Sequence, residues 1–305
     1  MRVEYREEPC RSALNRVRGM PFAWSLNPYT GCVHRCMFCY VRAFEARADR
    51  ASGEGYGSSI RVKANVAEVL RRELARPSWQ RESVTIGAAT DPYQPAEGRY
   101  ELTRACVHEL TRARTPFGII TRGPLIVRDL DVLQDASRRV PVSVNVSVPT
   151  LDERVWRTTE PGTAPPRRRL EVVRRLAEAG IDTAVALAPI LPGLSDAPER
   201  LAEVVRGARQ AGASHVWTSL LYLQPGTREH FLSVLAETGR RSWSATNGST
   251  PAERTSRRPR PSPFASSHAR PASPSARRNG CLSSRCNSSS RSEAPRQTGV
   301  VPHSS

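Results

Sequence analysis

Along the first 239 positions, short apolar runs alternate with stretches in which apolar residues recur at helical spacing. The short runs are bounded by turn-forming residues and predict β-strands. We expect six strands, at Phe22–Asn27, Ser83–Ala88, Phe117–Thr121, Val140–Val148, Thr183–Ile190 and His215–Leu223. The stretches between and after them predict amphipathic helices, at Val62–Ala75, Glu101–Ala113, Leu125–Ala136, Arg168–Ala179, Ala197–Ala211 and Arg228–Thr238.

This alternation of strands and helices indicates the fold class. Strands separated by helices form a parallel sheet with right-handed crossovers. Gly180 and Gly212 stand where helix C-caps belong, each shortly before a strand. The sequence therefore predicts an α/β protein built as an open barrel or a doubly wound sheet, and periodicity alone does not choose between them.

The last 66 residues have a different composition. Residues 240–305 contain 17 serines and 8 prolines and carry a net charge of +10, so residues 1–239 carry only +7 of the total of +17. Such a segment cannot bury enough apolar surface to offset its ordering entropy. We expect a core domain at 1–239 and a disordered tail at 240–305. The tail is either native and attractive to nucleic acid, or a frameshifted C-terminus.

Composition narrows the class of protein further. The 305 residues are enough for a sizeable core. No run of about 18 apolar residues occurs, so we expect no membrane span. The charged N-terminus also lacks the apolar stretch of a secretory signal. These features predict a cytoplasmic protein, in which seven cysteines indicate metal binding or thiol chemistry rather than disulfides.

Cys32, Cys36 and Cys39 follow the first predicted strand with the spacing C-x3-C-x2-C. Three thiolates at this spacing can hold one face of a metal cluster and leave a fourth position without a nearby ligand. Structural zinc requires that position to be filled, for which His34 or Cys10 is a candidate. A 4Fe-4S cluster held by three thiolates instead keeps one iron open for a small molecule. Zinc and unliganded structural cysteines stay open as alternatives.

The segment from Asn27 to Tyr40, with Phe38 as the aromatic residue of C-x3-C-x-aromatic-C, resembles the radical S-adenosylmethionine (SAM) enzymes. It is similar to the branch of spore photoproduct lyase and the DNA repair photolyase-like proteins. The similarity covers roughly residues 20–235 and continues in the family's order at Ile60–Asn65, Thr90–Glu97, Thr121–Leu130 and Ala188–Gly193.

The resemblance implies a partial (β/α)6 barrel of the TIM type, with the active site at the carboxyl ends of the strands. It implies a 4Fe-4S cluster and SAM as cofactors, and an electron donor such as a flavodoxin or ferredoxin as a partner. In this family the reduced cluster cleaves SAM to methionine and a 5'-deoxyadenosyl radical, which abstracts hydrogen from a substrate. The substrate is not specified by these residues.

Five candidate SAM-binding residues lie on or after predicted strands. Thr90 and Asp91 follow the second strand, where the superfamily places groups that accept from the SAM ammonium, and we expect Asp91 to be the charge partner. An Asp-Pro turn that only caps local backbone is the alternative. Ser143, Asn145 and Ser147 alternate along the fourth strand and share one face, where they are candidates for binding the ribose or carboxylate. Ordinary polar residues at the barrel mouth are the alternative.

Arg169 and Tyr40 complete the candidates. Arg169 lies in a position resembling a family element that begins at Glu160, and its guanidinium is a candidate for holding the SAM carboxylate bidentately. A solvated basic face is the alternative. Tyr40 directly follows the last thiol and is a candidate catalytic residue, whereas His34 is expected to be an ordinary loop residue.

Two features depart from the lyase pattern. Phe38 replaces one of the two tyrosines that flank the third cluster cysteine in spore photoproduct lyase, and no cysteine between Cys39 and Cys106 is present as a hydrogen donor. We therefore expect no repair of damaged DNA. Two other interpretations remain: a zinc-stabilised nucleic-acid-binding protein, and a truncated, inactive radical SAM relative.

Metal content tests the first of these interpretations. Anaerobically reconstituted protein should be brown and contain about four irons with sulfide, as a 4Fe-4S cluster requires. Replacement of Cys32, Cys36 or Cys39 by alanine should abolish the cluster, because each supplies one of only three protein ligands. Stoichiometric zinc without sulfide would contradict the cluster hypothesis, and iron, sulfide and zinc analysis decides.

Overall fold

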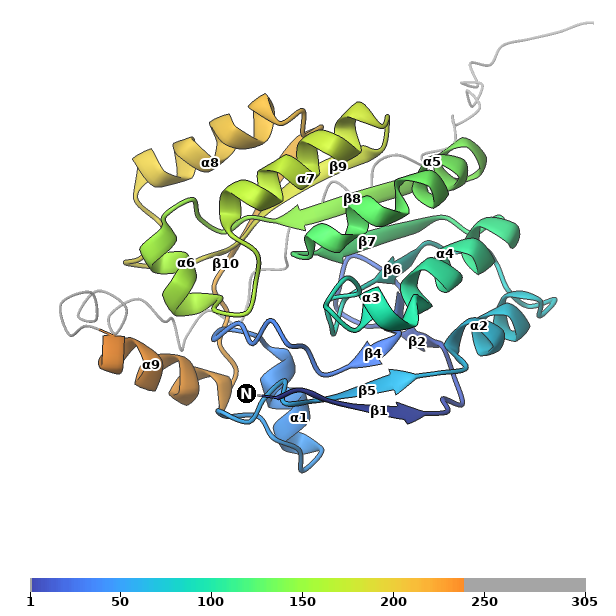
Figure 1. Cartoon of the computed structure of the whole chain (residues 1–305), viewed down its shortest axis with the longest axis horizontal. Coiled ribbons are helices and arrows are strands. Elements are labelled where there is room, and N and C mark those ends of the chain that lie inside the picture. Colours follow the sequence, from blue (N-terminus) through green and yellow to red (C-terminus); the bar gives the residue numbers. More distant parts are fainter. Residues whose placement is uncertain (1, 239–305) are drawn as a thin grey trace, which may run out of the picture. The chain divides into compact units, whose positions relative to one another are not determined.

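The predicted strands assemble into one seven-stranded sheet, which Figure 1 shows in the computed structural model. Its order is β10-β9-β8-β7-β6-β3-β2, and every neighbouring pair is parallel except β2 with β3. The parallel strands match the six predicted ones: β3 (Trp24–Leu26), β6 (Val84–Ile86), β7 (Phe117–Thr121), β8 (Val142–Ser147), β9 (Asp182–Ile190) and β10 (His215–Leu220). The edge strand β2 (Leu14–Arg16) was not predicted. The α/β class and the partial (β/α)6 barrel are confirmed.

The structure describes residues 2–238, all of them within one compact unit. The tail predicted at 240–305 lies outside the described residues, so its disorder and its boundary stay predictions. Within 2–238, no helix has the length and apolar character needed to cross a bilayer.

The predicted helices are present, with ends that differ by a few residues. They are α2 (Val66–Leu74), α4 (Leu102–Arg112), α5 (Leu130–Arg139), α7 (Pro166–Glu178), α8 (Pro198–Gln210) and α9 (Thr227–Thr238). The helix predicted from Leu125 begins instead with a 3-10 segment, η1 (Pro124–Asp129). Three short helices were not predicted, namely α1 (Val41–Arg47), α3 (Glu97–Tyr100) and α6 (Glu153–Thr159).

A small second sheet corrects one prediction. Its order is β1-β5-β4, formed by β1 (Glu4–Glu8), β5 (Ser59–Lys63) and β4 (Tyr29–Thr30). The helix predicted to start at Val62 was therefore wrong at its beginning, because Ile60 and Val62 alternate as buried strand residues and α2 starts at Val66.

The two faces of the main sheet differ in chemistry. Alternate strand residues on the outer face, such as Ile119 and Val144, join the helices in the large hydrophobic core. Aligned residues of parallel neighbours share a face, and on the other face most of them are polar or small, with Ile120 and Trp217 as exceptions. Its residues, in register across the sheet, include Ser25, Thr85, Gly118, Ser143, Asn145, Ser147, Ala184 and Ala186. We call this the inner face, and it leaves room for polar ligands.

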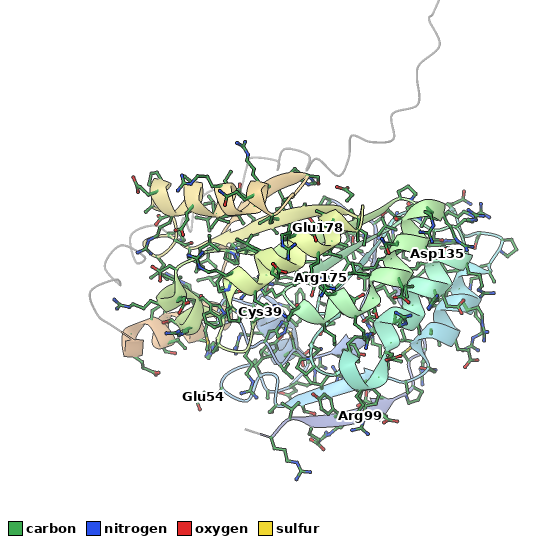
Figure 2. The ribbon with its side chains drawn as sticks, turned by 45° about the horizontal axis from the view of Figure 1, so that its top comes forward. Cys39, Glu54, Arg99, Asp135, Arg175 and Glu178 are labelled. Atoms are coloured by element: carbon green, nitrogen blue, oxygen red, sulfur yellow. The ribbon has the colours of Figure 1, made fainter. Side chains whose placement is uncertain are left out.

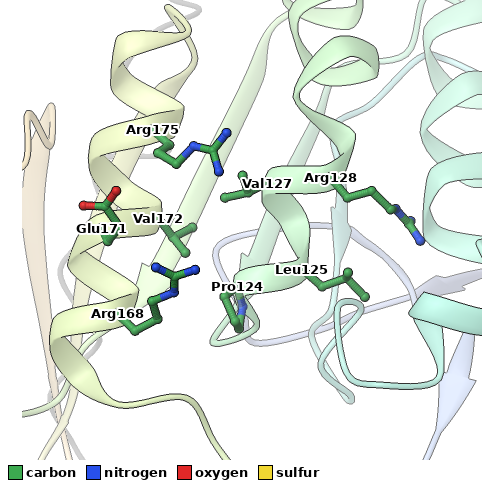
Figure 3. Close-up of a pocket in the computed structure, with 8 residues that line it drawn as sticks. All are labelled: Pro124, Leu125, Val127, Arg128, Arg168, Glu171, Val172 and Arg175. Atoms are coloured by element: carbon green, nitrogen blue, oxygen red, sulfur yellow. The ribbon is translucent and has the colours of Figure 1, made fainter.

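The outer helical layer also contains a groove of about 230 Å³ between η1 and α7 (Figure 3). Val127 and Val172 lie in it, and Arg168 and Arg175 extend from α7 toward η1. Since the helices of the large core cover the outer face of the sheet, this groove lies across the sheet from the inner face.

A buried carboxylate ties the small sheet to the helical layer. Glu97 is fully buried and accepts hydrogen bonds from the Tyr29 hydroxyl at 2.5 Å and from Arg128 at 3.0 Å. It also accepts from the amides of Thr103 and Arg104 at the start of α4, at 2.9 and 3.1 Å. Four donors in one place make this charge tolerable inside the protein.

Removal of that carboxylate should be costly. Glu97→Ala leaves the buried donors without an acceptor, so the free energy of unfolding should fall by about 3–5 kcal/mol, measured by urea denaturation. Asp135→Ala is the control, because Asp135 lies on α5 among exposed charged side chains (Figure 2) and its ion pairs with Arg138 and Arg139 are solvent-exposed. An equal loss in both variants would contradict the assigned role of Glu97.

Candidate functional site

The three cysteines lie in one loop at the carboxyl edge of the main sheet. The loop runs from β4 to α1, and its turns are closed by the amide of Arg35 on the Cys32 carbonyl at 3.4 Å and by that of Cys39 on the Cys36 carbonyl at 3.2 Å. Cys32 and Cys36 are buried and Cys39 is half-buried. The spacing predicted from the sequence therefore brings the three thiols to one region.

The electrostatics of the thiols bear on what they can bind. Burial raises the pKa of Cys36 and of Cys39, and the neighbouring thiols raise both further. The Arg122 guanidinium acts in the opposite direction on both. Metal binding deprotonates such thiols and releases the protons.

The donor set fits a thiolate-bound iron-sulfur cluster. Three cysteine sulfurs are the ligands such a cluster takes, and the guanidiniums of Arg42 and Arg122 both interact with the Cys36 and Cys39 sulfurs. Two cations beside the thiols offset the negative charge of a thiolate-ligated group. Within residues 2–238, no three cysteine, histidine or carboxylate side chains are arranged so that they could hold a single metal ion.

Two glycines let other segments approach the cysteine loop closely. At Gly57, where φ is +75°, an added Cβ would lie 2.3 Å from the Cys32 carbonyl oxygen. At Gly162, after α6, a Cβ would lie 2.4 Å from the Val33 carbonyl oxygen. Since neither position has space for a side chain, both segments are pressed against the backbone of the loop.

Asp91, predicted to bind SAM, is surrounded by internal partners. Its Oδ1 accepts from the Thr121 hydroxyl at 2.7 Å and the Tyr93 amide at 2.9 Å, and its Oδ2 accepts from the Arg122 amide at 2.6 Å. His34 Nδ1 lies 3.2 Å from Oδ2. Burial would raise the pKa of Asp91, but His34, the Thr121 hydroxyl and the Arg122 amide lower it to about 2.

These contacts give Asp91 a structural task. It stays ionised at neutral pH and joins the ends of β6 and β7 to the cysteine loop. Its role toward SAM stays a prediction. His34, expected to be an ordinary solvated residue, is buried beside this carboxylate.

Thr90 and Tyr40 also hold the backbone around the thiols. The Thr90 hydroxyl donates to the Gly31 carbonyl at 2.6 Å, and Gln94 donates to the same carbonyl at 3.2 Å. The Tyr40 hydroxyl donates to the Ala88 carbonyl. Both predicted residues therefore lie at the site, and their roles toward SAM or substrate stay predictions.

Arg169 lies in a buried network of charges. It is fully buried and donates to the carbonyls of Ala164 and Ser147, at 2.8 and 3.0 Å, and to Glu160 at 3.0 Å. Glu160 also accepts from Arg122 at 2.6 Å. Burial raises the pKa of Glu160, whereas Arg169 and Arg122 lower it, and the net shift is downward.

This network reaches the thiols from one side. The side chain of Arg169 is engaged by the protein rather than solvated, and the Arg122–Glu160 pair connects it to Cys36. A role of Arg169 in holding the SAM carboxylate stays a prediction.

Ser143 lies farther than Asn145 from the carboxyl end of their strand. Both lie on the inner face, but Ser143 is near the amino end of β8, roughly 13 Å before Ser147 at the carboxyl end. The Asn145 Oδ1 accepts from the Trp217 indole at 2.7 Å, across the small residues of β9. Their binding of SAM stays a prediction, and Ser147 is closer to the thiol edge.

Sequence reasoning missed four residues that shape the site: Arg42, Tyr56, Arg122 and Glu160. Each contacts the cysteine loop or its neighbours, Arg42 from the helix that follows the loop and the other three through groups farther away in sequence. Arg122 and Glu160 lie in segments that resemble the family, and this resemblance could have marked them as site residues. Their residue types alone did not indicate what they contact.

Fold and site together define a protein class, a partial (β/α)6 barrel that carries three thiols in one loop at the carboxyl edge of its strands. The chain belongs to the Radical SAM superfamily, whose family model matches residues 26–205.

Curated relatives and solved structures agree with this membership. An uncharacterized protein of Mycobacterium tuberculosis is 41% identical over 237 residues, covering 77% of this chain and 70% of the relative. A radical SAM Nalpha-GlyT isomerase of Pseudomonas phage M6 is 27% identical, covering 55% of this chain and 33% of the relative. Spore photoproduct lyase complexed with dinucleoside spore photoproduct has the same fold, with a TM-score of 0.59 and 14% identity over 76% of this chain. The chain spans 66% of that lyase chain.

The contacts of Asp91 yield a prediction for the protein without ligand. Asp91→Ala removes the acceptor of the Thr121, Tyr93 and Arg122 donors, so the free energy of unfolding without SAM should fall by about 1–3 kcal/mol. Urea denaturation of cluster-free protein measures this. A residue that only contacts SAM would leave this value unchanged and alter SAM affinity alone, which would contradict the structural role of Asp91.

Proposed function

We propose that this protein is a radical SAM enzyme that reductively cleaves SAM and abstracts a hydrogen atom from its substrate. The observation that carries the proposal is the gathering of the Cys32, Cys36 and Cys39 thiols in one buried loop at the carboxyl edge of the barrel. When bound, the reduced cluster supplies the electron that cleaves SAM. The three thiols would hold it, and Arg42 and Arg122 would offset its charge.

The inner face of the sheet supports a place for SAM and substrate beside the thiols. Ser147 and Thr85 lie on this face, and their hydroxyls make no hydrogen bond to other residues of the described range. Thr90, Asp91 and Arg169 fix the backbone around them. We propose that open inner-face groups bind the SAM ribose and carboxylate, with the Asp91 network holding their strands in place.

We propose a nucleic-acid component as the substrate class. The support comes from a protein with the same fold, since a dinucleoside spore photoproduct is bound to the lyase. The net charge of +7 on residues 1–239 suits a phosphate-bearing substrate.

Repair by the lyase route is disfavoured by the two thiols that lie outside the cluster loop within residues 2–238. Cys106 is buried in the core on the outer face of the sheet, and Cys10 packs against the same core. Neither is placed to donate hydrogen to a substrate at the inner face. Phe38 also packs in a hydrophobic cluster with Cys36. These placements support a reaction other than restoration of thymines.

An activity assay tests the proposal. Reconstituted protein, reduced by dithionite or by a flavodoxin, should release 5'-deoxyadenosine from SAM slowly without substrate, because cluster and SAM alone suffice for cleavage. Chromatography of the products measures it. Cys36→Ala should release none.

Further outcomes separate the competing interpretations. Ultraviolet-damaged DNA should remain unrepaired while SAM is cleaved, and restored thymines would contradict our assignment against lyase activity. A full, reducible cluster without 5'-deoxyadenosine would favour an inactive relative. Zinc in place of iron would favour a zinc-stabilised nucleic-acid-binding protein.

A further inference from the structure

A tyrosine outside the cysteine motif reaches one of the three thiols. Tyr56 lies in the loop before β5 and is almost completely buried, at 1% exposure. Its hydroxyl is 3.7 Å from Cys39 Sγ, within the range of a hydrogen bond to sulfur. A phenolic hydroxyl can both donate and accept a hydrogen bond.

Ligation determines the direction of this hydrogen bond. In the free protein, either the thiol or the hydroxyl can be the donor. A cysteine that ligates a cluster is a thiolate and has no proton to give. Tyr56 is then the only one of the two that can donate, and the Val41 amide donates to the same sulfur.

Arg42 fixes the Tyr56 ring in this place. Its guanidinium carbon lies 4.5 Å from the ring centroid. The same guanidinium donates to the Cys36 carbonyl at 3.1 Å and to the carbonyls of Ser52 and Gly53, at 2.7 and 2.8 Å. One buried cation therefore fastens the tyrosine loop to the cysteine loop, and Gly57, which has no space for a side chain, lets the two loops approach closely.

The other tyrosine near the thiols has a different partner. The hydroxyl of Tyr40 donates to the Ala88 carbonyl, so that side chain secures backbone. Among residues 2–238, Tyr56 is the tyrosine whose hydroxyl lies within hydrogen-bond distance of a ligand sulfur.

We propose that Tyr56 is a positioning residue that donates a hydrogen bond to the ligand sulfur of Cys39 and thereby raises the reduction potential of the cluster. The inference rests on the proposed function. Reduction adds one electron to the cluster, breaks no bond and increases the negative charge on its sulfurs. A donor at sulfur stabilises that reduced state more than the oxidised one, and hydrogen bonds to sulfur are among the determinants of cluster potentials. The Arg42 charge acts in the same direction.

The test compares the cluster potentials of two tyrosine variants. Tyr56→Phe keeps the ring under Arg42 and removes only the hydroxyl. Its equilibrium constant for one-electron reduction should fall about tenfold, which corresponds to about 59 mV more negative. Anaerobic redox titration followed by electron paramagnetic resonance measures this at equal iron content. Tyr93→Phe is the matched control, because it removes a buried tyrosine hydroxyl whose charged neighbours are Asp129 and Glu97 rather than the thiols, and its potential should equal that of the unaltered protein.

A second measurement needs no variant and keeps the inference testable if Tyr56→Phe does not load a cluster. On transfer of the unaltered protein to heavy water, a cysteinyl Fe–S stretching band in the resonance Raman spectrum should shift promptly, before buried amides such as that of Val41 exchange. Absence of the prompt shift overturns the proposal, as do equal potentials for Tyr56→Phe and the unaltered protein.

Failure of the proposed function has a different signature. In that case the unaltered protein binds no iron and sulfide, or holds a reducible cluster and cleaves no SAM. The potential of Tyr56→Phe is read from the cluster itself, so it reports on Tyr56 whether or not SAM is cleaved.

Discussion

Close backbone packing around the cysteine loop is the constraint on which the site depends. The loop has no regular structure between β4 and α1, so its own hydrogen bonds cannot fix three thiols. Gly57 approaches from one segment and Gly162 from another, each with no space for a Cβ. Thr90 holds the Gly31 carbonyl. The neighbouring segments at the carboxyl edge of the sheet therefore determine the shape of the loop.

Buried arginines provide the second part of this arrangement. Arg42 donates to backbone carbonyls, while Arg122 and Arg169 share the carboxylate of Glu160. A buried charge is costly unless it is paired or hydrogen-bonded. Arg122 and Arg169 are paired with Glu160, and Arg42 is hydrogen-bonded to backbone carbonyls. Because Arg42 and Arg122 lie beside the thiols, the groups that stabilise the fold here also determine the electrostatic environment of the cluster.

The two faces of the main sheet have different roles, since one packs in the hydrophobic core and the other carries small and polar residues. The outer face carries branched aliphatic residues that join the helices in one core. The inner face carries small and polar residues in the same strands, at alternate positions. Ala184 and Ala186 leave enough space for Trp217 to reach Asn145 across β9. The alternation of side chains along a strand thus gives a stable layer and a polar interior at once.

The sequence by itself determined the six parallel strands, most helices and the three cluster cysteines, because these follow from patterns within a few residues. It did not reveal β1, whose sequence EYREE has no apolar alternation, or β5, whose last two residues it assigned to a helix. It also grouped Ser143 with Asn145, since a shared face is a local property, whereas distance from the thiols depends on strand direction. Only the tertiary structure decided that Asp91 and Arg169 are engaged by internal partners and that Tyr56 and Arg42 lie against the thiols. These contacts join residues from separate loops and strand ends, and side-chain packing in three dimensions, rather than local periodicity, determines which of them meet.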